Sequence, residues 1–223
     1  MLPPRMSYTL SEFESKQLLD ACGIRVPPEV LVDDAEQAIC AAEGLGYPVV
    51  LKLCGPGIAH KSERNLVRLD LANPSEVGAE AQALLGLRGP GEADAGLLVA
   101  PMVSGRRELI AGLVRDPQFG PCVMLGLGGV LAEALDDVVF AVAPLEPWDA
   151  EDLIDALEHQ RILGELRGEP RVDRKKLGAL LETLGRIGLE SPEIRSIDLN
   201  PLVVSGAEPV IVDALVEVER EPA

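Results

Sequence analysis

Apolar positions in the first part of the chain switch between helical spacing and short continuous runs. Residues 11–23 combine a Ser-x-x-Glu capping box, helically spaced apolar positions and a closing glycine, so a helix is predicted there. A second helix is expected from Asp33 or Asp34 to Gly44, and a third from Asn73 to Leu85. The segments between these helices are predicted to be extended: IRVPPEVLV, YPVVLKLC and LVRLDL.

The remaining part of the chain shows longer apolar runs. Turn signals separate three of them, LLVAPMV, RELIAGLVRD and PCVMLGLGG, which is typical of an antiparallel sheet. Two helices are expected next, from Pro147 to about Leu163 and from Asp173 to near Gly188. The chain closes with two predicted strands around a Ser-Gly-Ala-Glu turn.

The glycine-rich segment GLRGPGEADAG, at residues 86–96, is the linker candidate of the chain. We therefore expect two lobes, residues 1–95 and residues 96–223. The order of elements predicts an α+β (mixed α/β) protein in which each lobe has a sheet and flanking helices. A small ligand is expected to bind between such lobes.

Charge and composition narrow the class of function. The formal net charge of −17 and the pI near 4.5 argue against general affinity for nucleic acid or for an anionic membrane surface. No apolar run reaches the length needed to span a bilayer, and the first residues lack the apolar core of a signal peptide, so a cytoplasmic protein is expected. The four cysteines occur singly, which favours buried thiols over a zinc or redox site.

The last hairpin places polar residues opposite one another. If residues 205–208 form the turn, Val204 faces Pro209, and Asn200 then lies opposite Asp213 with Asp198 on the same face. An amide oxygen and carboxylates at this spacing suit Mg²⁺, which takes few protein ligands and completes its shell with water and phosphate. The alternative is the polar outer face of an edge hairpin.

Lys52 and His60 fall within PVVLKLCGPGIAHKSE. A lysine inside an apolar strand must snorkel to solvent, pair with a core carboxylate or bind an anionic ligand. His60 follows in a glycine-containing loop, a place suited to an imidazole that contacts a ligand.

Glu108 lies in a largely apolar strand, where its carboxylate could hold a metal or a ribose hydroxyl, or pair with a neighbouring arginine. The GLGGV segment at residues 126–130 resembles phosphate-binding loops, but it lacks the lysine and the hydroxyl of a nucleotide P-loop. A tight turn is the alternative for this segment.

In combination, these segments resemble a known family. The similarity extends in order and spacing from about residue 8 to residue 218, through SEFESKQLLDACGIRVP, AAEGLGYPVVLKLCGPGIAHKSE, ELIAGLVRDPQFGPCVMLGLGGVLAEALDDVVFAVAPL, RGEPRVD and IDLNPLVV...VDA. It is a resemblance to the ATP-grasp beta subunit of ADP-forming acetyl-CoA (acyl-CoA) synthetases, which is related to the beta chain of succinyl-CoA synthetase. The resemblance implies an ATP-grasp fold with nucleotide between two lobes.

The resemblance also implies roles for individual residues. Lys52 matches the lysine that contacts the nucleotide phosphates, and Glu108 matches a glutamate of the nucleotide site. His60 matches the histidine that passes a phosphoryl group between a phosphohistidine of the alpha subunit and the nucleotide. The hinge that contacts adenine is matched by Ala100, Pro101 and Met102. The magnesium ligands are matched by Asn200 and Asp213.

The implied reaction converts acyl-CoA, ADP and phosphate to acid, CoA and ATP, with Mg²⁺ and ATP or ADP bound to this chain. The sequence contains no CoA-binding Rossmann segment, so a CoA-binding alpha subunit and a hetero-oligomer are implied.

The chain departs from the family pattern at a few positions: Asn65-Leu66 in place of two glycines, Ala100 at the hinge, Ala141 in place of an arginine, and Glu165 in place of a glycine. These departures leave open an alternative, a divergent ATP-grasp domain that binds nucleotide or a partner without catalysis. A different ATP-grasp ligase, in which an amine attacks an acyl phosphate, fits the HKS histidine less well.

Overall fold

The computed structural model describes residues 6–58, 61, 64–129 and 135–220. The chain divides into two compact units. The larger unit comprises Met1–Thr9, Leu18–Val26 and Val103–Ala223, and the smaller unit comprises Leu10–Gln17 and Pro27–Met102. Helix α1 (Glu12–Ala21) therefore contributes its first residues to the smaller unit and its last residues to the larger unit.

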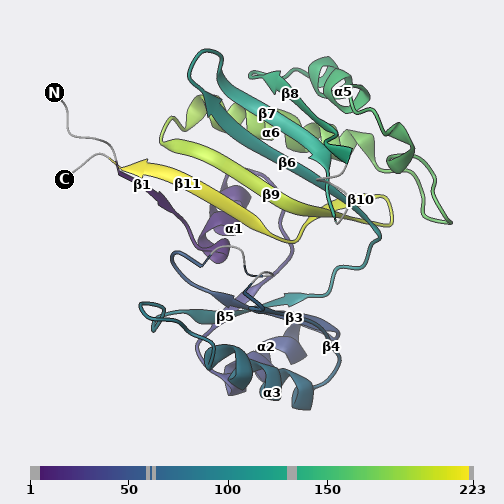
Figure 1. Cartoon of the computed structure of the whole chain (residues 1–223). Coiled ribbons are helices and arrows are strands. Elements are labelled where there is room, and N and C mark those ends of the chain that lie inside the picture. The colour runs from purple at the N-terminus through teal and green to yellow at the C-terminus, as the bar shows by residue number, and fades with distance from the viewer. Residues whose placement is uncertain (1–5, 59–60, 62–63, 130–134, 221–223) are drawn as a thin grey trace. The chain divides into compact units, whose positions relative to one another are not determined.

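The smaller unit is built on an antiparallel sheet in which the strands follow the order β2-β5-β3-β4. Its strands are β2 (Val30–Val32), β3 (Val49–Cys54), β4 (Val67–Leu71) and β5 (Gly96–Pro101). Helices α2 (Ala35–Leu45) and α3 (Pro74–Leu85) cover one face of this sheet (Figure 1). The side chains of Asp34 and Asn73 accept backbone N–H groups at the two helix starts, which confirms the predicted caps.

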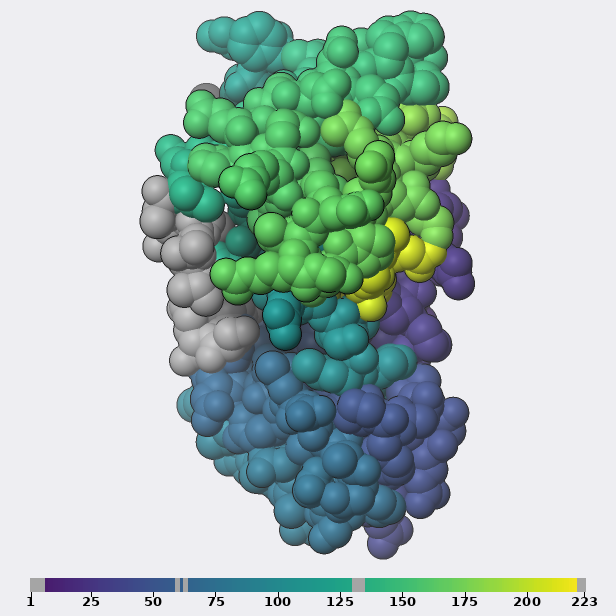
Figure 2. Space-filling model, turned by 90° about the vertical axis from the view of Figure 1, so that its right-hand side faces the viewer, coloured from purple at the N-terminus to yellow at the C-terminus, as the bar shows by residue number. Residues whose placement is uncertain are grey.

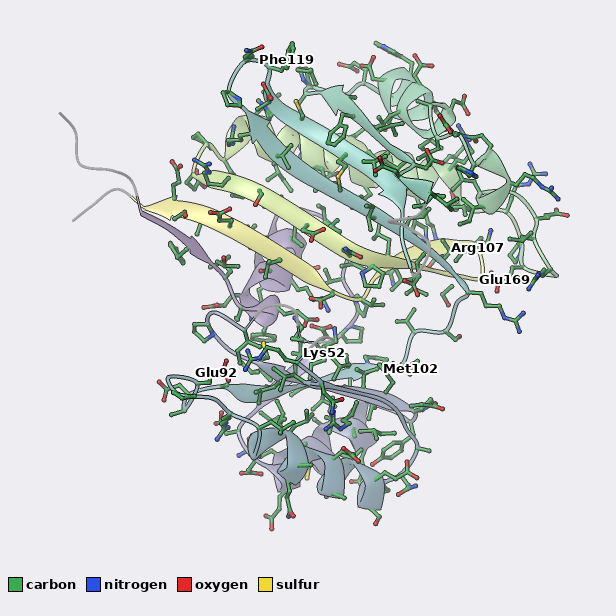
Figure 3. The ribbon with its side chains drawn as sticks, in the orientation of Figure 1. Lys52, Glu92, Met102, Arg107, Phe119 and Glu169 are labelled. Atoms are coloured by element: carbon green, nitrogen blue, oxygen red, sulfur yellow. The ribbon has the colours of Figure 1, made fainter. Side chains whose placement is uncertain are left out.

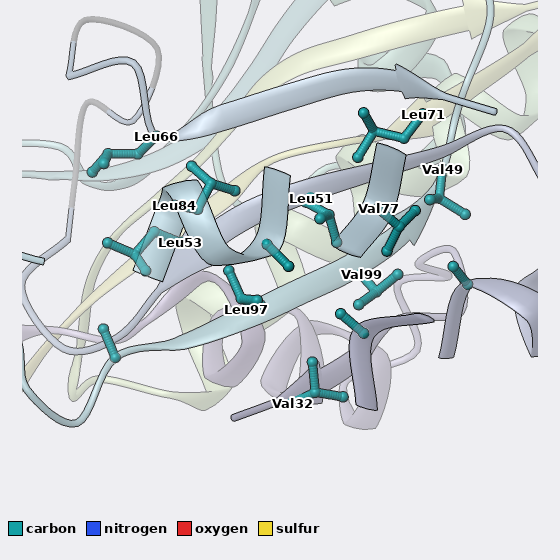
Figure 4. Close-up of a cluster of buried hydrophobic side chains, with 14 of the residues drawn as sticks. Val32, Val49, Leu51, Leu53, Leu66, Leu71, Val77, Leu84, Leu97 and Val99 are labelled. Carbon is teal, nitrogen blue, oxygen red and sulfur yellow. The ribbon is translucent and has the colours of Figure 1, made fainter. Parts of the chain in front are cut away.

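The core of the smaller unit lies between this sheet and its two helices (Figure 4). Leu51 and Leu53 on β3 point into it, together with Val77 and Leu84 on α3, and all four are fully buried. Burial of each such side chain contributes about 2 kcal/mol. The apolar runs of the sequence thus become one continuous cluster.

Strand β5 belongs to the smaller sheet, although the sequence grouped this segment with the strands that follow it. It pairs with β3 along its whole length and with β2 through Val99. Leu97 and Val99 are fully buried in the core described above. The compact unit therefore reaches Met102 rather than ending at residue 95, because these side chains need the cover of α2 and α3.

The larger unit contains a sheet that is seven-stranded within the described residues, with the order β1-β11-β9-β6-β7-β8 and β10 paired to β9. All of its strand pairs are antiparallel. The strands are β1 (Met6–Thr9), β6 (Arg107–Asp116), β7 (Gly120–Leu127), β8 (Val138–Val142), β9 (Ile194–Ser205), β10 (Glu208–Ile211) and β11 (Ala214–Arg220).

Helices α5 (Pro147–Asp155) and α6 (Arg174–Glu190) cover one face of the larger sheet (Figure 1). Gly188 permits the close approach of α6, since a Cβ atom there would lie 2.7 Å from the Cβ of Pro121. The green residues in Figure 2, which include α5, form a continuous outer surface on this unit. Among the described residues, no helix combines the length and the apolar character that crossing a membrane requires.

Helix α5 ends earlier than the sequence predicted. The expected helix reached Leu163, but α5 stops at Asp155 and a short 3-10 turn, η1 (Gln160–Ile162), follows. The carboxylate of Asp137 accepts the backbone N–H groups of Glu158 and His159 at 3.0 and 2.8 Å. These N–H groups are thereby withdrawn from the helical ladder, a tertiary effect that local periodicity does not contain.

Candidate functional site

Lys52 lies in a buried ion cluster of the smaller unit (Figure 3). Its Nζ atom is 2.5 Å from Oε1 of Glu12, the first residue of α1. The same oxygen accepts a hydrogen bond from Lys16 at 2.8 Å, and Oε2 of Glu12 is 2.7 Å from Nζ of Lys61. Lys16 also pairs with Glu29. Of the three possibilities that the sequence left open for Lys52, a salt bridge to a core carboxylate is therefore present.

The cluster remains charged although it is buried. Burial alone would raise the pKa of Glu12, but the ammonium groups of Lys52, Lys16 and Lys61 outweigh it and hold this pKa well below its usual range. Burial would lower the pKa of Lys16, yet Glu12 and Glu29 raise it. Glu12 and Lys16 thus stabilise each other's charged forms.

The loop after β3 carries the predicted histidine. His60 lies outside the described residues, and Lys61 is the described residue nearest to it in sequence. The backbone carbonyl of Lys61 accepts the N–H of Leu66 at 2.8 Å, which closes the loop before β4. Lys61 is therefore held both by its main chain and by its side chain.

Asn65 and Leu66 occupy positions where the family pattern has two glycines. Asn65 has a φ of +55°, a backbone conformation that glycine adopts freely and asparagine adopts more readily than most residues. Leu66 is 2% exposed and belongs to the core of the smaller unit. The first departure preserves the glycine-like backbone, and the second adds apolar packing.

The predicted hinge, Ala100 to Met102, lies at the end of β5. Pairing with β2 stops at Val99, so in the described ladder Ala100 and Pro101 pair with β3 only. The N–H of Met102 donates to the carbonyl of Pro48 at 3.0 Å. The predicted hinge therefore lies where β5 extends beyond its neighbour β2.

Glu108 lies next to the glycine loop that follows β7. The N–H of Gly128 donates to the backbone carbonyl of Glu108 at 2.8 Å. A Cβ atom on Gly128 would lie 3.1 Å from the Cβ of Glu108, and one on Gly129 would lie 3.4 Å from Oε2 of the carboxylate. Gly129 also has a φ of +80°. The glycines therefore let this loop pass directly beside the Glu108 side chain.

The hairpin of the larger unit has the register that the sequence predicted. Val204 pairs with Pro209, and the turn between β9 and β10 contains Gly206 at a φ of +61°. Because side chains alternate along a strand, this register decides which polar groups share a face of the sheet.

Asn200 and Asp213 lie at the break between β10 and β11. Strand β11 resumes with Ala214 opposite Leu199, in the same register as the hairpin. Asn200 therefore stands opposite Asp213, as the sequence argument placed it. The N–H of Val212 donates to the carbonyl of Pro201 at 3.2 Å, which keeps the two chains together at the break.

Asp198 shares the environment of Asp213. Protein atoms around the carboxylate of Asp198 partly desolvate it and raise its pKa, and the nearby Asp213 carboxylate raises it further. Two carboxylates that repel each other beside an amide oxygen fit a divalent cation. Among the described residues no group of three or more His, Cys, Asp or Glu side chains is arranged to hold a metal. The smaller set fits Mg²⁺, which needs only one or two protein carboxylates when phosphate and water supply the rest.

Arg107 organises the end of the larger sheet and was not singled out from the sequence. It is 2% exposed, and its guanidinium bonds to Glu169 and to four backbone carbonyls (Figure 3): those of Ile162, Gly164, Pro170 and Gly206. Arg107 and Glu108 are consecutive residues of β6, so their side chains lie on opposite faces of the sheet. An arginine in an otherwise apolar strand was the available signal.

Glu12 was also missed. The capping box at Ser11 and Glu14 is confirmed by reciprocal bonds at 2.9 and 3.3 Å, and Glu12 looked like an ordinary acidic residue in a first helical turn. Its contact with Lys52 joins residues far apart in sequence, which a local pattern does not reveal.

Comparison with known proteins identifies the family to which nearly the whole chain is similar. A family model described as an ATP-grasp domain matches residues 4–218. The beta subunit of ADP-forming acetate–CoA ligase I from Pyrococcus furiosus is 37% identical over 208 residues, which cover 92% of this chain and 90% of that protein. ADP-forming acetate–CoA ligase I from Archaeoglobus fulgidus is 38% identical, and there the match covers 90% of this chain and 30% of the longer protein.

A solved structure agrees with these relatives. It contains acetyl-coenzyme A synthetase 1 of Ca. Korarchaeum cryptofilum in complex with coenzyme A and Mg-AMPPCP, with the phosphohistidine segment pointing towards the nucleotide binding site. The similarity has a TM-score of 0.81 at 37% sequence identity, and it covers 96% of this chain and 93% of that chain.

Proposed function

The chain belongs to the ATP-grasp beta subunits of ADP-forming acetate–CoA ligases, and on that premise we propose that it is the nucleotide-binding subunit of an ADP-forming acyl-CoA synthetase. It binds ADP or ATP with Mg²⁺ and carries phosphoryl transfer between a phosphohistidine and the nucleotide. The observation that supports this most directly is the pair Asn200 and Asp213, opposed in register with Asp198 beside them.

The metal and nucleotide ligands are part of this proposal, and the geometry within each unit supports them. Asn200 and Asp213 hold Mg²⁺, which when bound neutralises charge on the phosphate oxygens. Glu108, beside the glycine loop, contacts the nucleotide. The ammonium of Lys52 binds phosphate, and the backbone of Ala100 to Met102, where β5 extends beyond β2, takes the adenine.

His60 acts as the phosphoryl carrier. A neutral imidazole nitrogen attacks phosphorus, a bond to the donor histidine of the partner breaks, and an oxygen of ADP then displaces His60 to form ATP. Two phosphoryl transfers over short distances thus replace one transfer over a long distance. The attacking nitrogen must carry no proton, so the transfer requires the neutral form of the imidazole.

A CoA-binding alpha subunit completes the enzyme. Relatives of this chain include a protein named as a separate beta subunit and a longer protein of which the match covers 30%. A cytoplasmic hetero-oligomer is part of this proposal. The catalytically silent alternative loses support because Asn65 keeps a glycine-like backbone at the position of greatest departure.

Calorimetry with ADP and Mg²⁺ tests the nucleotide site. We expect saturable binding to the wild-type chain and at least a tenfold weaker Mg²⁺-dependent affinity in Asp213→Asn. Asp152→Asn, an exposed change on α5, is the matched control and should bind like wild type. Absence of binding to the wild-type chain refutes the proposal.

Assay of the complex with a CoA-binding subunit tests the relay. CoA-dependent ATP formation from acyl-CoA, ADP and phosphate should be lost in His60→Ala while ADP binding persists. Full turnover in that variant rejects His60 as the carrier, and binding without any turnover in the wild-type complex favours the silent alternative.

A further inference from the structure

The carboxylate of Glu12 connects Lys52 on β3 with Lys61 in the loop that follows β3. Its Oε1 atom is 2.5 Å from Lys52 and its Oε2 atom is 2.7 Å from Lys61, so each oxygen holds a different ammonium group. Lys52 extends from the middle of β3, and Lys61 lies beyond it in the chain. One carboxylate therefore sets where both ammonium groups lie.

We propose that Glu12 is a positioning residue for phosphoryl transfer, which fixes Lys52 and Lys61 in one arrangement that receives the phosphates of the nucleotide. The inference rests on the proposed function, in which Lys52 contacts phosphate. It adds the start of the first helix to the machinery of the smaller unit, a role that no motif in the sequence indicated.

The position of Glu12 is itself well determined. It is the first residue of α1, and the capping box formed by Ser11 and Glu14 fixes the backbone around it. The side chain is 1% exposed. Lys16, one turn further along the helix, donates to Oε1 at 2.8 Å and is held in turn by Glu29. The carboxylate therefore has little freedom to rotate.

Fixing a lysine in advance matters for catalysis. A lysine side chain has four rotatable bonds, and ordering it on binding costs up to about 2 kcal/mol. When a carboxylate orders two lysines before the nucleotide arrives, this cost is met during folding. A displacement of about 1 Å at a catalytic group can reduce the rate about a hundredfold.

A buried ion cluster can also serve stability alone, and the two roles predict different results. If Glu12 only balances charge, any carboxylate at this position should suffice, and its loss should lower the melting temperature without changing the kinetics of the folded enzyme. If Glu12 positions the lysines, the length of its side chain matters as well, since a shorter carboxylate does not reach both ammonium groups.

The test compares Glu12→Gln, Glu12→Asp and a matched control, Glu92→Gln, in the complete enzyme with its CoA-binding subunit. Glu92 pairs with Arg64 in the same unit but outside the cluster (Figure 3), so its change removes an ion pair without touching Glu12. For each variant, kcat and KM for ADP are measured below its melting temperature, together with Mg²⁺-ADP binding by calorimetry.

We expect kcat/KM for ADP to fall about ten- to a hundredfold in Glu12→Gln. Glu12→Asp should remain at least fivefold below wild type despite its restored charge, and the control should match wild type. Wild-type kinetics in folded Glu12→Gln overturn the inference, as does full rescue by Glu12→Asp. If Glu12→Gln does not fold, the kinetics of Glu12→Asp decide alone. Failure of the wild-type chain to bind ADP refutes the proposed function instead, so the two failures are distinguishable.

Discussion

Asn200 stands opposite Asp213 because β10 and β11 pair with β9 in one continuous register. The break between the two strands falls at this pair, since β10 ends at Ile211 and β11 begins at Ala214. The sheet on either side of the break keeps the two residues at a fixed separation.

This relationship predicts that loss of either side chain removes the metal response. Asn200→Ala should fold, since Asn200 is exposed, but the rise in melting temperature produced by Mg²⁺ and ADP should disappear. Differential scanning calorimetry with and without Mg²⁺-ADP measures this. The control Asp152→Asn should keep the full rise, and a wild-type rise in Asn200→Ala would contradict the assignment.

Removing the charge of Asp198 should raise the stability of the metal-free chain and reduce the stabilisation that Mg²⁺ provides. Its pKa is raised in the folded chain, so its ionised form is disfavoured there and the unfavourable contribution is relieved as pH falls through that pKa. At neutral pH, Asp198→Asn should therefore raise the melting temperature in EDTA. It should also reduce the additional stabilisation by Mg²⁺-ADP. A lower melting temperature in EDTA would show that the two carboxylates do not repel each other.

Arg107→Lys should destabilise the larger unit. Lysine offers a single ammonium in place of a planar fork, so most of the bonds to Glu169 and to the four carbonyls would be lost. We expect the free energy of unfolding to fall by about 2–4 kcal/mol. Denaturant unfolding followed by the single tryptophan, Trp148, measures it in this unit. Arg106→Lys, an exposed neighbour, should change stability by less than about 0.5 kcal/mol.

Leu66→Gly, which restores a glycine of the family pattern, should destabilise the smaller unit by about 3–5 kcal/mol. The side chain of Leu66 is 2% exposed, and its removal leaves a cavity in the core. Asn65→Gly should be tolerated to within about 1 kcal/mol, because the backbone there already has a positive φ. Amide exchange of the core strands distinguishes the two variants, and equal protection in both would refute the packing role of Leu66.

The stability of the smaller unit should depend on pH through Glu12. Its pKa is depressed in the folded chain, so its contribution is complete above the ordinary glutamate pKa of about 4.3 and is lost as pH falls below it. Glu12→Gln should therefore be less stable than wild type at pH 7, with a difference that shrinks towards pH 3. The pKa of Glu29 is raised by burial, so its contribution to stability changes with pH in the opposite direction. Subtracting the curve of stability against pH of Glu12→Gln from that of the wild type removes this contribution. A difference independent of pH would contradict the charged state of Glu12.

Local features of the fold could be predicted because their causes are local. The cap at Asn73 depends on neighbouring residues, and so does the turn at Gly206. The register that places Asn200 against Asp213 also followed from the sequence, since a short turn determines which residues of a hairpin face each other. Lys52 stood out because an ammonium in an apolar strand requires a partner.

The identity of that partner was decided only by the tertiary structure. Glu12 and Lys52 are separated by 40 positions, and Arg107 and Glu169 by 62, so their contacts depend on how whole strands and helices pack. The placement of β5 in the smaller sheet and the early end of α5 have the same origin. Periodicity and capping specify which segments become helices and strands. The pairing of buried charges and strands is chosen by the free energy of the assembled core, in which every buried polar group must find a partner.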